Sequence, residues 1–227
     1  VDNQVRLANI FRQQPAVLAL DLGEDAGALA AKATEAASLL ETSRIDVLLC
    51  CAGLGQRSAA CDTPAQAHAR IMAQFEGHVA LTREVLPPML ACGSGSIGVV
   101  SSVQGFFGQP YRSSYAAAKA AEVGFFDSLR AEVAASGVTV TMIVPGYIAT
   151  DHSAAAIGGS GALDANAMGG MDPAELACIM ADSLEAGRAE VVAAPLYARC
   201  AILWRVLWPA TFFAYMRSKA KNVIADT

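Results

Sequence analysis

The chain has 227 residues, of which 54% are hydrophobic and 16% charged, and its formal net charge is −5. A chain this long and apolar can bury one large core, which argues against intrinsic disorder. The acidic balance without a basic stripe argues against nucleic acid as a partner, and no stretch reaches the roughly 20 apolar residues of a membrane-spanning helix.

Short apolar runs alternate with longer helical patterns along the chain. The runs are rich in Val, Ile and Leu, as buried parallel strands are. The expected strands are Ala16–Leu20, Ile45–Cys51, Ser96–Ser101, Val138–Val144 and Ala189–Ala194, and the expected helices cover about 26–40, 64–90, 113–135 and 173–186. This alternation predicts an α/β fold with a Rossmann-like, doubly wound parallel sheet covered by helices on both faces.

Polar residues predict where three of the helices begin. Asp62 or Thr63 would cap the second helix, and Ser113 or Ser114 the third. Asp172 would cap the fourth, with Pro173 in its first turn.

We expect one Rossmann-like domain over residues 1–200, followed by a separate tail at residues 201–227. The Gly- and Ala-rich segment Ser153–Met171 predicts a mobile loop that closes over the substrate.

Candidate metal ligands lack the spacing of a metal site. The six cysteines show no C-x-x-C pair, and no His pair follows at zinc-ligand distance. We therefore expect buried or idle thiols in a reducing compartment and no metal. His68 and His78 carry no ligand pattern. For His152 a solvated loop position is the favoured interpretation, with the substrate mouth as the alternative.

The segment Ser101–Lys119 carries the candidate chemistry. Tyr115 and Lys119 are four residues apart on an expected helix, so their side chains share one face. Ser102 lies just beyond the C-terminal end of a strand, which is the edge where open α/β sheets bind ligands. We therefore predict that the three side chains converge.

These residue types suit hydride chemistry at a carbonyl. Reduction needs a proton donor and the reverse reaction needs a base, and an ammonium beside a phenol favours the phenolate. Lys119 would supply that charge to Tyr115, and Ser102 would hold the substrate oxygen where negative charge develops. Because Y-x-x-x-K is common by chance, the pair alone also fits a surface Tyr and Lys. The Ser spacing, the preceding strand and the later Pro-Gly turn favour the catalytic interpretation.

In these motifs the chain resembles the short-chain dehydrogenase/reductase family, in order and over nearly its whole length. The resemblance implies that Ser102, Tyr115 and Lys119 are catalytic, that Asp21 contacts the cofactor adenine and that a P-G-x-x-x-T turn contacts the nicotinamide end. The cofactor-binding residues that it implies are Asp21, Cys51, Ala52, Gly53, Tyr115, Lys119, Pro145, Gly146, Ile148 and Thr150. Within the family the chain is most similar to the branch of members 7 and 7B, in residues 124–133, 144–151 and 208–222.

The resemblance implies an NAD(P)(H)-dependent oxidoreductase that interconverts a hydroxyl and a carbonyl group, with NADP favoured over NAD. We expect a small lipophilic substrate, such as a steroid, retinoid or lipid carbonyl, held by Ser102, Phe106 and Tyr147, with Phe107 beside them. The resemblance also implies an intracellular protein at a membrane such as the endoplasmic reticulum, and a homodimer is a candidate assembly.

Three departures from the family pattern bear on activity. Gln74 stands where the family has a catalytic Asn, so its proton relay is expected to be weakened. Cys50 and Cys51 replace the two asparagines of N-N-A-G, and thiols are poor hydrogen-bonding groups. The sequence holds no T-G-x-x-x-G-x-G turn for the pyrophosphate, nor the strand before it.

From that last departure we expect an N-terminally truncated sheet without its first two strands. Residues 16–20 would then pair directly with residues 46–50 or hang loose, and the chain would bind nicotinamide cofactor weakly. The alternative function is a catalytically inactive family member, either a membrane-associated interaction module or a non-functional fragment.

The segment Ala201–Lys221 holds both tryptophans and ends with basic residues. This pattern fits a helix in a membrane interface, which Pro209 should kink or split. The alternative is a terminal helix packed on the domain or on a second subunit.

Overall fold

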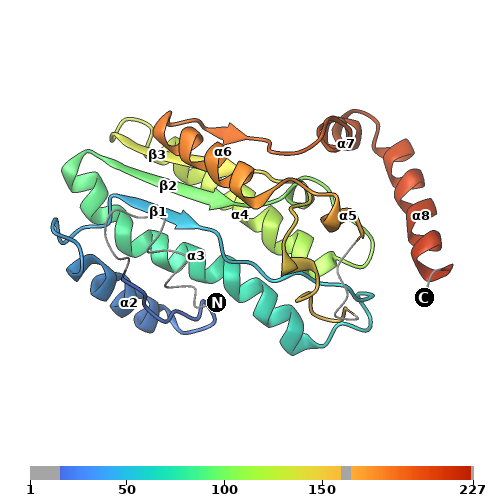
Figure 1. Cartoon of the computed structure of the whole chain (residues 1–227), viewed down its shortest axis with the longest axis horizontal. Helices are drawn as coiled ribbons and strands as arrows, with labels where there is room; N and C mark the ends of the chain where they lie inside the picture. Colours follow the sequence, from blue (N-terminus) through green and yellow to red (C-terminus); the bar gives the residue numbers. More distant parts are fainter. Residues whose placement is uncertain (1–15, 160–164, 226–227) are drawn as a thin grey trace.

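The structure is a computed structural model that describes residues 16–159 and 165–225. Within those residues the sheet has four parallel strands in the order β1-β2-β3-β4 (Figure 1). The strands are β1 (Val47–Cys50), β2 (Gly95–Val100), β3 (Val138–Ile143) and β4 (Glu190–Val191). The expected α/β fold with a parallel sheet is confirmed, and so are four of the expected strands.

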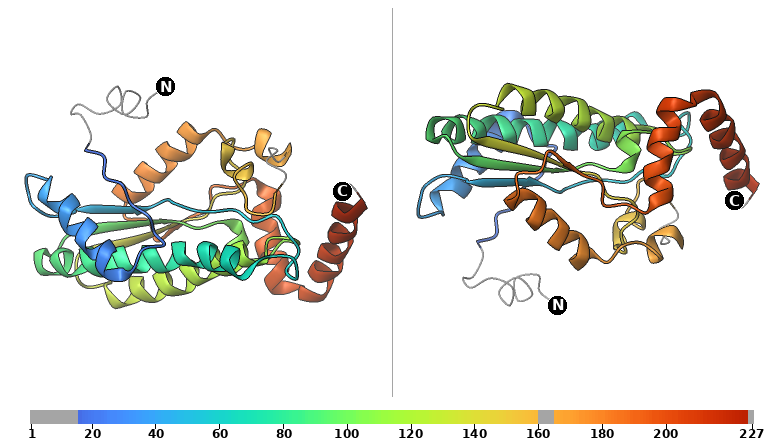
Figure 2. Two further views of the ribbon diagram at one scale, coloured as in Figure 1. Left: turned by 90° about the horizontal axis from the view of Figure 1, so that it is seen from below. Right: turned by 90° about the horizontal axis from the view of Figure 1, so that it is seen from above.

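Helices cover both faces of the sheet (Figures 1 and 2). One face carries α3 and α4, with α2 packed on α3, and the other face carries α6. The helices are α2 (Ala26–Ser38), α3 (Ala65–Cys92), α4 (Ser113–Glu132), α5 (Ala165–Met168), α6 (Pro173–Glu185), α7 (Leu196–Leu207) and α8 (Pro209–Ala225), with short 3₁₀ turns η1 (Val103–Gly105) and η2 (Asp151–Ser153).

The main core lies between the sheet and helices α3 and α4. Ile97 and Met142 of adjacent strands are fully buried, and Phe126 of α4 and Met89 of α3 pack in the same cluster. Because all strands run in the same direction, their C-terminal ends meet at one edge of the sheet. That edge is the ligand-binding edge of an open α/β sheet.

The prediction of a strand at residues 16–20 is wrong. This segment is extended but pairs with no strand among the described residues, and Val17 and Leu20 are exposed. A strand needs a hydrogen-bonded neighbour. Within the described part of the chain β1 pairs with β2 alone, so residues 16–20 do not pair with it. Of the two outcomes considered for this segment, the unpaired one occurs.

After the unpaired segment the chain crosses α3 at close range. Leu22 lies against Gly77, where a Cβ atom would come within 2.7 Å of Leu22 Cβ and 2.8 Å of its carbonyl oxygen. Only glycine fits there without a shift of the backbone, so Gly77 sets how closely this segment approaches α3.

Of the three helix caps predicted from the sequence, only the cap of α6 is confirmed. Asp172 caps α6 by accepting the Ala174 backbone N–H at 2.7 Å, and Pro173 is the first residue of the helix. Helix α3 follows Pro64 without a side-chain cap, and Thr63 bonds its own loop instead. Helix α4 begins at Ser113 itself, so neither Ser113 nor Ser114 precedes the helix as its cap.

The C-terminal residues form the two helices α7 and α8, divided at Trp208-Pro209 as expected from the proline. The expected domain boundary at residue 200 falls inside α7. Phe212 and Met216 of α8 are buried in the main core cluster, and Phe212 makes edge contacts with Phe107 and Trp204. In Figure 1 these two helices lie at one end of the sheet.

Candidate active site

A cavity of about 250 Å³ lies at the C-terminal edge of the sheet. The loops that follow β1, β2 and β3, together with α4, α6 and the 151–171 segment, supply its walls. It is lined by Cys51, Gly53, Val100, Ser101, Ser102, Val103, Gln104, Gln109, Arg112, Tyr115, Lys119, Pro145, Gly146, Tyr147, Ile148, Thr150, His152, Ala167 and Leu176. Ser102, Tyr115 and Lys119, which the sequence predicted to converge, therefore face one cavity.

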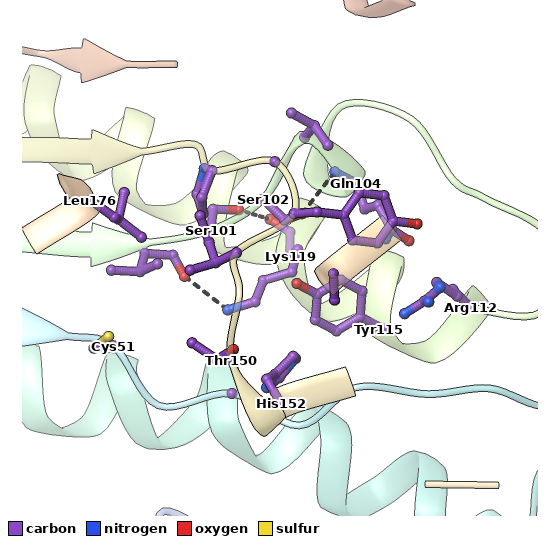
Figure 3. Close-up of a pocket in the computed structure, with 18 of the residues that line it drawn as sticks. Cys51, Ser101, Ser102, Gln104, Arg112, Tyr115, Lys119, Thr150, His152 and Leu176 are labelled. Atoms are coloured by element: carbon purple, nitrogen blue, oxygen red, sulfur yellow. Dashed lines mark hydrogen bonds between the residues drawn. The ribbon is translucent and has the colours of Figure 1, made fainter. Parts of the chain in front are cut away.

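Tyr115 and Lys119 project from the same face of α4. Lys119 is buried and its Nζ donates to the Val100 carbonyl oxygen at 2.9 Å and to Glu122 Oε1 at 3.0 Å. Figure 3 shows the Tyr115 hydroxyl on the side of its ring that faces Lys119 and Ser102. A cation is thus fixed in the cavity that the phenol also lines.

Ser102 is held in extended conformation directly after β2. Its Oγ accepts the Gln104 backbone N–H at 3.1 Å, which leaves the hydroxyl proton free to point at a ligand. The neighbouring Ser101 hydroxyl donates to the Lys119 carbonyl oxygen at 3.0 Å. This bond ties the Ser102 loop to α4, so the position of the serine and that of the lysine are coupled.

A residue that the sequence analysis missed fixes the start of α4. Gln56, fully buried in the loop after β1, accepts the backbone N–H of Ser114 at 2.7 Å and of Tyr115 at 3.4 Å. Its amide nitrogen donates to Thr63 Oγ1 at 2.7 Å. No local pattern links these positions, because a helix cap is normally sought in the residues just before the helix.

His152 lies beside Tyr115 at the cavity wall, with their ring centroids 6.2 Å apart. Burial of the imidazole, together with the positive charges of Lys119 and Arg112, lowers the pKa of His152 below its ordinary value of 6.5. The residue is nevertheless exposed. His152 is therefore a solvated loop residue, as favoured, that also lines the cavity, as in the substrate-mouth alternative.

Gln74 lies on α3 behind the cavity and is not a lining residue. A Cβ atom on Gly53 would lie 3.7 Å from both Gln74 Oε1 and Lys119 Nζ. The glutamine amide and the lysine ammonium thus approach the same point next to Gly53. This location is compatible with the weakened relay that the sequence predicts.

Three other predicted residues do not line the cavity. Asp21 is exposed and accepts the Gly23 backbone N–H at 2.9 Å. Ala52 is exposed beside the cavity without lining it. Phe106 packs against the main core, not at the substrate position predicted for it. Tyr147, by contrast, does line the cavity, and its hydroxyl lies 3.4 Å from Gln109 Oε1.

The loop predicted over the substrate is held at both ends. Ile157 forms a bridge with Gln56, and Met171 forms one with Ile148. Between them, residues 160–164 lie outside the described residues. Ala167 of α5 is buried and lines the cavity, so the segment covers one side of it.

The cysteines form no disulfide. Burial raises the pKa of the Cys50 thiol to about 12, with a smaller effect from the Glu122 charge, and burial also raises the pKa of Cys51. Both are therefore neutral thiols at physiological pH. Within the described ranges, no group of His, Cys, Asp and Glu side chains could hold a metal ion.

The sequence matches known proteins over most of its length. The family model of the short chain dehydrogenases matches residues 5–158. Dehydrogenase/reductase SDR family member 7B of Xenopus tropicalis is 35% identical over 225 residues, which cover 97% of this chain and 72% of that protein. The same-named protein of Danio rerio is 39% identical over 183 residues, 78% of this chain. The match spans 59% of the Danio rerio protein's length.

Solved structures share the fold. A short-chain dehydrogenase from Streptomyces avermitilis superposes with a TM-score of 0.76 at 22% identity, covering 96% of this chain and 84% of that chain. A short chain dehydrogenase from Burkholderia cenocepacia, solved in complex with NADP, superposes with a TM-score of 0.74 at 21% identity, covering 95% and 84% of the two chains.

Proposed function

The chain belongs to the short-chain dehydrogenase family of NAD(P)-dependent oxidoreductases, and from this we propose that it interconverts a hydroxyl and a carbonyl group on a small lipophilic substrate. The observation that carries the proposal is that Ser102, Tyr115 and Lys119 line one cavity at the C-terminal edge of the sheet. In the same proposal Gln74 is a weakened relay behind Lys119.

The cavity fits the nicotinamide end of the cofactor. Gly53 has no side chain to fill the space in front of Lys119 Nζ, and that ammonium has three N–H donors, of which two are used by Val100 and Glu122. The remaining donor can bond a ribose hydroxyl. Pro145, Gly146, Ile148 and Thr150 line the same cavity. We infer that Asp21 and Ala52 contact parts of the cofactor that lie beyond this cavity.

When bound, NAD(P)H supplies the hydride that adds to the carbonyl carbon. The Ser102 hydroxyl donates a hydrogen bond to the carbonyl oxygen as negative charge develops on it. Tyr115 gives its proton to that oxygen, and the Lys119 cation stabilises the phenolate that remains. In the reverse direction the phenolate removes the alcohol proton, so one arrangement of side chains serves both directions.

The remaining walls support a lipophilic substrate. Val103, Ile148, Ala167 and Leu176 present apolar side chains to the cavity. Apolar walls with a small set of polar groups at one point are typical of pockets for lipophilic ligands.

The reaction is tested by following NADPH oxidation with a panel of steroid, retinoid and aliphatic ketones and aldehydes. Tyr115→Phe should lower kcat by about 10² to 10⁴, and Ser102→Ala by about 10² to 10³. Tyr111→Phe is the matched control, because this tyrosine bonds the Ala220 carbonyl oxygen and does not line the cavity. A Tyr115→Phe chain as active as the parent would refute the mechanism.

The exposed side of α7 and α8 supports a membrane surface as a second partner. Within the described residues no helix is both long and apolar enough to cross a bilayer. The exposed apolar side chains there include Leu203, Val206, Leu207, Trp208, Phe213 and Tyr215. Arg205 lies over the Phe213 ring at 4.8 Å. Aromatic and aliphatic groups beside cations are typical of a helix lying in the headgroup region, such as that of the endoplasmic reticulum.

Co-sedimentation with liposomes tests this surface. The triple variant Leu207→Ser/Trp208→Ser/Phe213→Ser should pellet less with anionic vesicles than the parent. The control is Leu39→Ser/Leu40→Ser, which changes two exposed leucines just after α2 and should leave pelleting unchanged. If the surface instead packs on a second copy, the parent will sediment as a dimer and the triple variant as a monomer, with no vesicle binding by either.

A further inference from the structure

A buried line of ionisable side chains runs from the cavity into the contact between α3 and α4. Lys119 Nζ lies 3.0 Å from Glu122 Oε1, and the same carboxylate oxygen lies 3.1 Å from His78 Nδ1. The side chains of Glu122 and His78 are each 1% exposed. Glu122 is one turn after Lys119 on α4, whereas His78 comes from α3, 44 residues earlier in the chain.

The location of this pair is costly for stability. A buried carboxylate loses its hydration, and an apolar side chain would fill a helix–helix contact without that loss. The other carboxylate oxygen, Oε2, and His78 Nε2 have no hydrogen-bond partner among the described residues. The pair is thus only partly hydrogen-bonded as a structural element, and the contact of Glu122 with Lys119 gives a reason for its burial.

Those contacts act on the lysine in two ways. First, the Val100 carbonyl oxygen and Glu122 together fix the ammonium, so that its third donor is left for the cavity. Second, the Glu122 charge offsets part of the Lys119 charge. The strength with which Lys119 favours the Tyr115 phenolate therefore depends on Glu122.

His78 acts on the carboxylate and not directly on the lysine. An ionised carboxylate only accepts hydrogen bonds, so when Glu122 is ionised His78 Nδ1 is the donor in the 3.1 Å hydrogen bond to Glu122 Oε1. This bond from α3 fixes the carboxylate against rotation. It also links the position of the lysine to the packing of the two helices.

Other titratable groups lie around Lys119, and Arg112 lines the same cavity as a second cation. Cys50 and Cys51 face it from the end of β1, and burial raises the pKa of both thiols. His152 faces it from η2, and burial with the nearby cations lowers its pKa. Tyr115 shares its helix, and Gln74 of α3 is uncharged. Among the described residues around Lys119, the negative charge therefore comes from Glu122.

We propose that Glu122 and His78 are a positioning pair that holds Lys119 in place and sets the pH range in which Tyr115 exchanges its proton. The proposal rests on the function proposed above for Tyr115 and Lys119. Neither member of the pair lines the cavity, so both act through the lysine.

The experiment measures ionisation of Tyr115 directly, so that it needs no turnover. The near-ultraviolet absorbance of the phenolate is titrated in the full chain, and the titration of Tyr115→Phe is subtracted to isolate this residue from the other four tyrosines. The same subtraction is made with Glu122→Gln and Glu122→Gln/Tyr115→Phe. Because Gln removes a nearby negative charge, the midpoint should fall by about one pH unit or more.

The matched control is Asp127→Asn, which removes a carboxylate from the exposed side of the same helix, where Asp127 pairs with Arg130. It should leave the midpoint unchanged. The double variant His78→Leu/Glu122→Leu replaces the buried pair by apolar side chains of similar size, and it serves if Glu122→Gln does not fold. It should lower the midpoint in the same direction.

The outcomes separate this proposal from the proposed function. A midpoint that moves in both Glu122 variants, in a chain that reduces no carbonyl substrate, supports the positioning pair and contradicts the enzyme assignment. An active chain whose midpoint and pH–rate profile are the same in the parent, Glu122→Gln and the double variant overturns the positioning pair and leaves the enzyme assignment intact.

Discussion

Gln56 caps the helix that carries Tyr115, by accepting the Ser114 backbone N–H at 2.7 Å from a loop 58 residues earlier in the chain. The start of α4 thereby depends on the loop after β1, which also contributes Gly53 to the cavity. The cavity walls are thus tied to each other and do not merely lie side by side.

Replacing this cap should weaken both the fold and the site. Gln56→Leu leaves buried N–H groups without an acceptor and should lower the free energy of unfolding by about 1 to 3 kcal/mol. Urea denaturation measures the loss. Asp172→Ala removes the exposed cap of α6 and is the control, with a loss of about 1 kcal/mol and an unchanged kcat. A Gln56→Leu chain with the parent's kcat would contradict the link to the site.

The crossing of Leu22 over α3 predicts opposite effects for two helix glycines. Gly77→Ala forces a Cβ to within 2.7 Å of Leu22 and should cost about 1 to 3 kcal/mol. Gly124→Ala on α4 meets nothing within 4 Å and should stabilise by about 0.5 to 1 kcal/mol, since alanine is the better helix former. Thermal unfolding compares the two, and equal shifts in Tm would rule out the close approach.

The acid dependence of stability should include a contribution from His152. Its pKa is lowered in the folded chain, so the unfolded chain binds the proton first as the pH falls. The free energy of unfolding should therefore decrease as the pH drops through about 6.5. His152→Gln removes this contribution and should flatten the profile measured by urea denaturation between about pH 7.5 and 5.5. Identical slopes would show that the imidazole is not perturbed.

Shortening the side chain of Gln74 should increase activity. Gln74→Asn restores the shorter amide typical of the family and should raise kcat, by up to about tenfold, because a displaced relay transfers protons less efficiently. Gln74→Leu removes the amide and should lower kcat. If Gln74→Leu were as active as the parent, the side chain would have no part in proton transfer.

The thiol of Cys50 should be inert in the folded chain. It is 3% exposed, and burial raises its pKa to about 12, so almost no thiolate forms at about pH 8. A thiol reagent should label the exposed Cys61 and Cys92 first and Cys50 only after unfolding. Mass spectrometry of Cys50→Ser should show the same native labelling as the parent and one label fewer in urea.

Local patterns in the sequence were sufficient for the repeating parts of the fold. Runs of Val, Ile and Leu predicted the strands that became β1 to β4, because parallel strands covered by helices are rich in these side chains. They failed at residues 16–20, which have the same composition. Whether such a run forms a strand depends on a hydrogen-bonding neighbour, and composition carries no information about one.

The same division holds at the candidate site. The spacing of Tyr115 and Lys119, and the place of Ser102 after a strand, were enough to predict that the three meet, because helix and strand geometry fix these relations locally. The roles of Gln56, His78 and Glu122 were not predictable. Each depends on a partner at least 44 residues away or on burial between two helices, and neither follows from the residues nearby.

The sequence alone was enough to predict that a hydroxyl, a phenol and an ammonium face one cavity, since Tyr115 and Lys119 share a helix face and Ser102 follows a strand at the ligand-binding edge. Only the tertiary structure decided the environment of that chemistry: a carboxylate and an imidazole behind the lysine, an imidazole beside the phenol and a distant amide at the helix start. The physical reason is that helix and strand geometry acts over a few residues, whereas burial and charge act between all groups that packing brings together.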